Sequence, residues 1–320
     1  MVEPTLYGRS TGLSPVAVVV SATFWTALWG PIGLVLATPL TVCLVVLGRH
    51  VERLAFLDVM FGDRPALSPP EIFYQRMLAG DPTEAAEKAE EFLKERSLSS
   101  YYDEVALSGL MLAQSDLARD ALDQARLSKI RDTVIEFTED LSEQPDEEPI
   151  GGEITGDAEA AAAVEGIAPT TEFEGIPVLQ REHLPVEWQG VCPVICIAGR
   201  TSLDEAAGMM FSHLCRVHGL PARTERPEIL TTANLREVDL SGIALVCLSY
   251  LDAQHPAHLR YAVRRLRRKL PHAIIVLACW KIDDPGNLET LRAASKADHV
   301  AGSLRECVRL CVEIVRPAVR

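Results

Sequence analysis

The sequence lacks a surplus of basic residues, since 31 Lys and Arg stand against 45 Asp and Glu and the formal net charge is −14. A surface that binds nucleic acid must be basic to displace counterions from the phosphates, so no nucleic-acid partner is expected. The eight cysteines lack the spacing of secreted disulfide frameworks and of zinc sites. Buried thiols in a reducing cytoplasm, without a metal, are expected instead. Residues 1–13 also lack the charged start and apolar core of a cleavable signal peptide.

The residue sets of common catalytic sites are missing as well. No Ser/His/Asp order, metal-ligand quartet or pair of carboxylates stands out at a convincing spacing. Ser249, Asp252 and His255 lie close together in the sequence, but chance also produces such a cluster. We therefore expect no cofactor, no metal and no catalytic residues, and we expect that the chain is not an enzyme.

Charged residues and histidine are absent between Ser14 and Leu47. About 20 apolar residues suffice to cross the hydrocarbon core of a bilayer, so this run is long enough to enter a membrane. Proline removes a helix hydrogen bond and glycine loosens the backbone, which predicts a break in the middle and another further on. The residues at these breaks are Trp29, Gly30, Pro31, Gly33 and Pro39. The run predicts a tight membrane hairpin or a kinked helix with a re-entrant half; a hydrophobic hairpin in a soluble core is the alternative.

Basic residues flank this run, with Arg9 before it and Arg49, His50 and Arg53 after it. Positive residues favour the cytoplasmic side, so a hairpin with both ends in the cytoplasm satisfies this rule and a single span does not. Non-helical backbone at membrane depth must be covered by protein. The expected partners are therefore the lipid bilayer and either a homo-oligomer or further upstream helices.

Spaced elements of residues 1–55 carry a family resemblance. They are Val2-Glu3-Pro4, Leu6, Gly8-Arg9, Leu13-Ser14-Pro15, Phe24-Trp25, Leu28-Trp29-Gly30-Pro31-Ile32-Gly33-Leu34 and Ala37-Thr38-Pro39-Leu40. This pattern resembles the last membrane portion of the autoinducer-2 exporter family of permeases, and Glu52–Val59 and Tyr74–Leu78 resemble the tail of one branch of that family. The resemblance implies the C-terminal part of a multi-pass permease in the bacterial inner (plasma) membrane, with upstream helices before the matched portion and a tail in the cytoplasm.

Residues 56–141 show the apolar spacing of helices. After a first helix that begins near Ser68, helices are expected at Glu84–Arg96, Tyr102–Gln114 and Ser115–Leu141, and Asp81 or Thr83 is placed to cap the second. No repeat period recurs, so an interaction scaffold and ordinary helical packing both remain open. Residues 142–189 are rich in acids and poor in bulky apolar residues, which predicts a disordered linker.

From Val191 onward, apolar strand-like runs alternate with helical segments. Strands are expected at Val191–Ala198, Ile243–Leu251, Ala273–Trp280 and Asp298–Ala301. Helices are expected at Leu203–His218, Pro256–Leu270, Leu288–Lys296 and Arg305–Val315. This alternation predicts a parallel sheet that is covered on both faces. Residues 190–320 are therefore predicted to form an α/β domain of about five strands, with a flavodoxin-like or cobalamin-binding-like fold.

Ligands of such folds bind beyond the carboxyl ends of the strands. The polar residues expected there are Gly199, Arg200, Thr201, Ser202, Ser249 and Asp252. The loop Gly199–Ser202 precedes a helix whose N-terminus favours an anion, with Ser202 as the predicted cap. The loop lacks Gly-x-Gly-x-x-Gly and Walker spacing, so a plain strand–helix turn is the simpler interpretation. The cobalamin-type Asp-x-His-x-x-Gly loop is absent too.

The helix predicted at Pro256–Leu270 is strongly basic, and its docking residues are predicted to be Arg260, Arg264, Arg265, Arg267 and Arg268. Such a cluster binds anionic lipid or an acidic segment of the same chain, or forms a solvated face. Three functional hypotheses follow. The first is a permease with a cytoplasmic regulatory or scaffolding tail, the second a membrane-anchored module that senses a small ligand, and the third an α/β enzyme.

Overall fold

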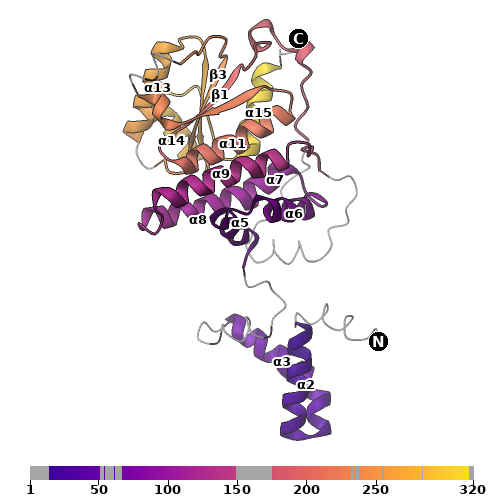
Figure 1. Cartoon of the computed structure of the whole chain (residues 1–320). Helices are drawn as coiled ribbons and strands as arrows, with labels where there is room; N and C mark the ends of the chain where they lie inside the picture. Colours follow the sequence, from indigo (N-terminus) through magenta and orange to yellow (C-terminus); the bar gives the residue numbers. More distant parts are fainter. Residues whose placement is uncertain are drawn as a thin grey trace. The chain divides into compact units, whose positions relative to one another are not determined.

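The computed structural model describes residues 14–50, 54, 61, 67–148, 175–231, 234, 238–253, 256–282 and 284–316. The chain divides into two compact units, Met1–Ser68 and Pro69–Arg320 (Figure 1). The first contains a helical hairpin. The second contains a bundle of helices and a parallel sheet.

The hairpin consists of α2 (Pro15–Trp29) and α3 (Pro31–His50). Its turn is Gly30, whose φ of +65° is a conformation that only glycine adopts readily, and the predicted break at this point is therefore confirmed. The prediction that Pro39 breaks the second helix is wrong, because α3 continues through this residue. Gly33 allows the close packing of the two helices, since a Cβ atom there would lie 1.9 Å from the carbonyl oxygen of Trp25.

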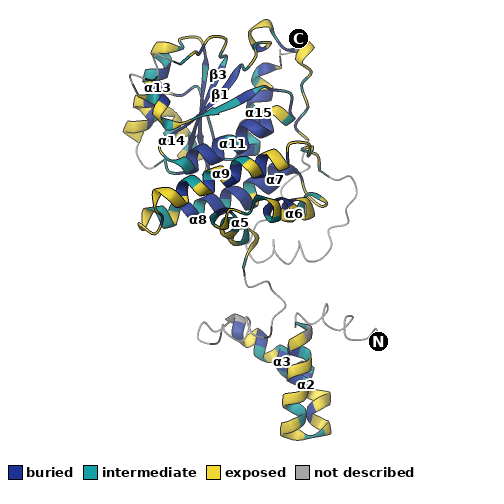
Figure 2. Cartoon of the chain, viewed as in Figure 1, coloured by how far each residue is buried: buried dark blue, intermediate teal, exposed yellow. Residues whose placement is uncertain are grey.

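The outer surface of the hairpin is apolar and exposed (Figure 2). The exposed large apolar side chains are Val16, Val19, Val20, Phe24, Leu28, Trp29, Ile32, Leu34, Val35, Leu36, Val46 and Leu47. By length and composition, one helix of the described residues, Pro31–Gly48, is able to cross a membrane, and Val16–Trp29 is a shorter apolar helix. The predicted helical hairpin is thus present.

The second unit begins with a helical bundle. Its helices are α5 (Pro69–Ala79), α6 (Pro82–Leu93), α7 (Leu98–Tyr101), the π-helical turn η2 (Tyr102–Ala106), α8 (Leu107–Ala118) and α9 (Gln124–Asp140). Asp81 caps α6 as predicted, because its carboxylate accepts a hydrogen bond from the Glu84 amide. The predicted break between Gln114 and Ser115 is wrong. The helix runs on to Ala118, and the turn comes at Asp120, which has a φ of +57°, just before the Asp123 cap of α9.

A five-stranded parallel sheet follows, in the order β2-β1-β3-β4-β5. Its strands are β1 (Val194–Ala198), β2 (Ala222–Glu225), β3 (Leu245–Tyr250), β4 (Ile274–Cys279) and β5 (His299–Ala301). Its helices are α11 (Ser202–Val217), α13 (Pro256–Lys269), α14 (Pro285–Ser295) and α15 (Leu304–Val315). The predicted α/β domain of the flavodoxin-like type is confirmed. The sequence did not reveal β2, because its four residues ARTE carry neither an apolar run nor a clean alternation.

Alternate residues of the strands enter different cores. Val194, Cys196 and Cys247 belong to the core beneath α11 and α15, whereas Ile195 and Val246 belong to the core beneath α13. The bundle lies on the α11 and α15 side, and its helices share that first core with the sheet (Figures 1 and 2). The helices α13 and α14 cover the opposite face (Figure 1).

Both described ends of the predicted linker pack against this unit, which corrects the prediction that residues 142–189 are disordered throughout. Ile176, Leu184 and Trp188 are buried, the last two beside the short turns η3 (Arg181–His183) and η4 (Val186–Trp188). The Leu179 amide donates to the carbonyl of His218 at 2.9 Å. Residues 149–174 lie outside the described residues.

Candidate functional site

The loop after β1 was the first predicted ligand site, and the protein's own carboxylate fills it. Thr201, not Ser202, caps α11, because the Thr201 hydroxyl accepts from the Asp204 amide. The Asp204 carboxylate accepts in return from the amides of Arg200 and Thr201, both at 2.9 Å. These are the donors that would bind an anion at this helix end. Ser202 is the first residue of the helix and is half-buried.

Asp204 also connects this loop to the neighbouring strand. Its second carboxylate oxygen accepts from the Leu251 amide at 2.7 Å, just beyond the end of β3. Burial raises the pKa of Asp204, and the hydrogen bonds from the three backbone amides oppose that rise. The carboxylate therefore ties together the ends of β1 and β3.

Two aromatic side chains fill the remaining space at these strand ends. A Cβ atom on Gly199 would lie 2.2 Å from the ring of Tyr250, so the glycine is needed for this ring to fit. The indole of Trp280 donates to the hydroxyl of Ser249 at 2.8 Å, and Ser249 in turn donates to the Asp204 carbonyl. Ser249, Tyr250 and Trp280 are all buried. The sheet edge is thus packed by side chains of the chain itself.

The other predicted residues of this edge do not converge on one point. Arg200 is exposed and takes part through its backbone amide, while Asp252 is half-buried. His255 lies outside the described residues, so the cluster that it forms with Ser249 and Asp252 in the sequence is not observed. Among the described residues, no group of three His, Cys, Asp or Glu side chains is placed to hold a metal ion.

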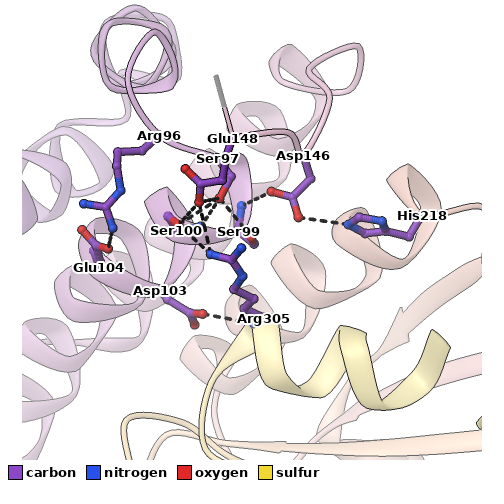
Figure 3. A network of polar contacts seen from close by, with 10 residues as sticks. All are labelled: Arg96, Ser97, Ser99, Ser100, Asp103, Glu104, Asp146, Glu148, His218 and Arg305. Atoms are coloured by element: carbon purple, nitrogen blue, oxygen red, sulfur yellow. Dashed lines mark hydrogen bonds and ion pairs between the residues drawn. The ribbon is translucent and has the colours of Figure 1, made fainter. Parts of the chain in front are cut away.

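A polar network that the sequence did not predict joins the bundle, the start of the linker and the α/β domain (Figure 3). Asp146 and His218 are buried and hydrogen-bonded at 2.9 Å, and the second contact of Asp146 is the Ser99 amide at 2.6 Å. Burial raises the pKa of Asp146, but the hydrogen bonds from His218 and Ser99 outweigh that effect and lower it. Glu148 pairs with Arg305 at 3.2 Å.

Asp103 attaches the bundle to the first turn of α15 (Figure 3). Its two carboxylate oxygens accept from the amides of Leu304 at 2.7 Å and Arg305 at 3.0 Å, and the Lys281 ammonium donates to its carbonyl. Burial raises the pKa of Asp103 to about 6, against the opposing hydrogen bonds. The partners are about 200 residues apart in the sequence, so no local pattern reveals this contact.

The basic helix α13 provides a different kind of surface. Arg260, Arg264 and Arg268 are exposed and recur every four residues, which places them on one face of the helix. They line a groove of about 700 Å³ between α13 and the end of α14, together with Tyr261 and Lys296. This groove therefore gathers positive side chains from two helices.

Two of the predicted docking arginines have other contacts. Arg267 pairs with Asp298 and donates to the Ala273 carbonyl at 2.8 Å, so it fastens α13 to the sheet. The guanidinium of Arg265 lies over the ring of Tyr261, 5.6 Å from its centre. Arg267 also lines the groove, so it both contributes to this basic surface and holds the helix in place.

The sequence matches no known protein-family profile and no curated protein. The solved structures that it resembles weakly include a cobalamin-binding protein from Desulfitobacterium hafniense DCB-2, with 9% identity and a TM-score of 0.32, and the monomethylamine corrinoid protein of Methanosarcina barkeri, with 9% identity and a TM-score of 0.42. Each similarity covers 77% of this chain and 98% of the other.

These findings correct the first functional hypothesis. The described residues contain one helix of spanning length, whereas a multi-pass permease has several. A multi-pass permease or transporter is therefore the wrong description of this chain. The resemblance of residues 1–55 to a permease family stays a prediction.

Proposed function

We propose that this chain is a membrane-attached docking protein without a catalytic centre. In this proposal the α2–α3 hairpin is held in the hydrocarbon of a bilayer, and the Pro69–Arg320 unit binds an anionic partner through the groove on α13. The observation that carries the proposal is the hairpin surface, which is apolar and exposed on both helices. Soluble monomers rarely expose a continuous apolar patch of more than a few hundred Å².

The polar groups of the hairpin support the same reading. Thr23, Thr26 and Thr41 each donate to the carbonyl four residues earlier, at 2.8, 2.6 and 2.8 Å. The indole of Trp25 donates to the hydroxyl of Thr41 at 3.2 Å. In hydrocarbon a polar group has no water to bond, so it must find its partner within the protein. At about 1.5 Å per residue, α2 is about 22 Å long, which is shorter than the hydrocarbon core.

The absence of a catalytic role is proposed from the strand-end contacts. Among the buried polar groups at this edge, Asp204 and Ser249 are bonded to the protein itself, while the Tyr250 hydroxyl has no hydrogen-bond partner among the described residues. A corrinoid, which the similar proteins bind, does not fit this edge. The loop Gly199–Ser202 contains no imidazole, and the Tyr250 ring occupies the space beside Gly199. We therefore assign no chemistry of a cofactor to this chain.

Carbonate washing of membranes tests the attachment. The full chain is expected in the membrane pellet, and a version that lacks residues 1–60 is expected in the supernatant. A double variant, Val20→Lys with Val35→Lys, places charge on exposed apolar positions, so it is expected to float poorly with liposomes. Its matched control, Val20→Leu with Val35→Leu, keeps the apolar surface and is expected to behave as the natural chain.

The contrary result is a full chain that is soluble and monodisperse in carbonate. The hairpin would then be a packed element of a soluble protein, and the attachment would be refuted. Stoichiometric binding of hydroxocobalamin by the full chain would refute the absence of a cofactor site.

A further inference from the structure

We propose that the groove between α13 and α14 binds the phosphate headgroups of an anionic bilayer, on the membrane that holds the hairpin. This inference rests on the proposed function, and it names the partner of that docking surface. The groove is lined by Arg260, Arg264, Arg267 and Arg268 from α13 and by Lys296 at the end of α14, and of these Arg267 is paired with Asp298. Guanidinium groups are suited to phosphate, because their planar set of donors matches its oxygens.

The charge in this groove is not balanced by its own helix. The helix α13 contains six basic residues and no acidic one between Pro256 and Lys269. Arginines four residues apart repel each other and weaken a helix. The helix dipole stabilises positive charge in the last turn of α13. Arg260 and Arg264 lie too far from this end of the helix to be stabilised in the same way. Among the described residues, no ion pair is formed by Arg260, Arg264 or Arg268.

Lys296 adds an independent observation. It ends α14 in the left-handed conformation, with a φ of +63°, where glycine is the favoured residue. A lysine at such a position bears a conformational cost that glycine avoids. Its exposed side chain lines the same groove as the arginines of α13. A further positive charge is thus added to the groove from a second element.

Tyr261 favours a bilayer over a soluble acidic protein. Its ring is 56% exposed and lies within the basic groove. A tyrosine ring is amphipathic and is favoured at the level of lipid headgroups. The chain as a whole has a net charge of −14, which repels free acidic proteins. When the hairpin attaches the chain to a membrane, the groove instead encounters the lipid headgroups at high effective concentration.

Amine labelling of the full chain in lipid nanodiscs tests this inference. The rate of acetylation of Lys296 by sulfo-N-hydroxysuccinimide acetate is measured by mass spectrometry, with Lys88 on α6 as the internal reference. In discs that contain phosphatidylserine, Lys296 is expected to react about fivefold more slowly than in pure phosphatidylcholine discs. The protection is expected to disappear near 1 M salt, where the Debye length falls to about 3 Å.

Two triple variants separate the groove from total charge. Arg260→Gln, Arg264→Gln and Arg268→Gln together are expected to abolish the protection of Lys296. Arg119→Gln, Arg309→Gln and Arg316→Gln change the net charge equally at exposed positions outside the groove, and they are expected to preserve the protection. Equal reactivity of Lys296 in both kinds of disc would overturn the inference and leave a soluble acidic partner as the occupant.

Failure of the attachment itself gives a different result. Co-elution of the chain with both kinds of disc shows that the hairpin is inserted. A chain that enters the discs but shows no lipid-dependent protection refutes only the lipid partner. A chain that enters neither kind of disc refutes the proposed function, and the inference falls with it.

Discussion

Two carboxylates, those of Asp204 and Asp103, hold loops and helix ends of the Pro69–Arg320 unit together. Asp204 accepts three backbone hydrogen bonds from two loops, and Asp103 accepts two from the first turn of α15. Each carboxylate takes the place that a bound anion occupies in other proteins. The polar groups at these helix ends are therefore structural, and the amides that they bind are unavailable to a ligand.

Replacement of Asp204 tests its structural role. Asp204→Ala leaves the amides of Arg200, Thr201 and Leu251 without their acceptor in a buried position, so the free energy of unfolding is expected to fall by about 2–4 kcal/mol. The matched control is Arg200→Ala, whose side chain is exposed and which is expected to change stability by less than about 0.5 kcal/mol. Urea unfolding measures both. Equal stability of Asp204→Ala and the natural chain would contradict this role.

Asp103 predicts a dependence of stability on pH. Its pKa is about 6 in the folded protein, above the usual value of 3.8, so the folded state holds its proton more tightly than the unfolded state does. The stabilisation by this proton is complete below about pH 4 and is lost as the pH rises through about 6. Relative to Asp103→Asn, which does not titrate, the natural chain is expected to lose about 2–3 kcal/mol over this interval. A difference between the two proteins that stays constant from pH 4 to 7 in urea unfolding would contradict this prediction.

At the scale of elements, the hairpin depends on close contact between its helices. Gly33 has no room for a side chain, because the Trp25 carbonyl lies where its Cβ atom would be. The break at Gly30 was readable from the sequence, since glycine and proline act on the local backbone. The close approach at Gly33 depends on the partner helix, which local sequence does not specify.

Gly33→Leu is expected to push α2 and α3 apart by about 2 Å, because the separation of packed helices depends on the side chains at their contact. Spin labels at positions 20 and 46, both exposed, allow this separation to be measured by pulsed electron resonance, after the accessible Cys43 and Cys192 are replaced by Ser. Leu34→Ala changes an exposed side chain beside it and is expected to leave the distances unchanged. An unchanged distance in Gly33→Leu would refute the close packing.

At the scale of the molecule, the bundle and the α/β domain share one core. The same buried cluster contains Phe137 and Leu110 of the bundle, Phe211 of α11 and Val308 of α15. The polar network in Figure 3 joins the bundle to the α/β domain, and the buried pair of Asp146 and His218 lies at one end of it. The acidic residues at the start of the predicted linker therefore belong to the folded unit.

A shared core predicts that this unit unfolds in one step. In urea, the loss of helix seen by far-ultraviolet circular dichroism and the exposure of Trp188 and Trp280 seen by fluorescence are expected to have one midpoint, because both report the same cooperative transition. The fluorescence is read in a chain with Trp25 and Trp29 replaced by Phe. Residues 190–320 alone are expected to aggregate, since α11 and α15 would expose the apolar faces that the bundle covers. Two separate midpoints would show that the bundle and the sheet are independent.

The sequence by itself determined the elements whose signals are local. A run without charge, the glycine and proline of a turn, and the alternation of apolar strands with helices each depend on residues that are neighbours in the chain. The hairpin and four of the five strands could be predicted from these signals alone. The basic residues of α13 were equally visible, but the sequence did not show that four of these arginines line a groove or that one of them, Arg267, is bound to Asp298.

Only the tertiary structure decided which polar residues are available to a ligand. Asp204 fills the predicted anion site, Asp103 caps a helix some 200 residues away, and Asp146 is buried against His218. Sequence gives the chemistry of a side chain, but its partners depend on which distant elements pack together. The same physical reason explains why the sequence left both an anion site and a plain strand–helix turn open at the end of β1, and why it did not show that Lys296 lies beside the arginines of α13.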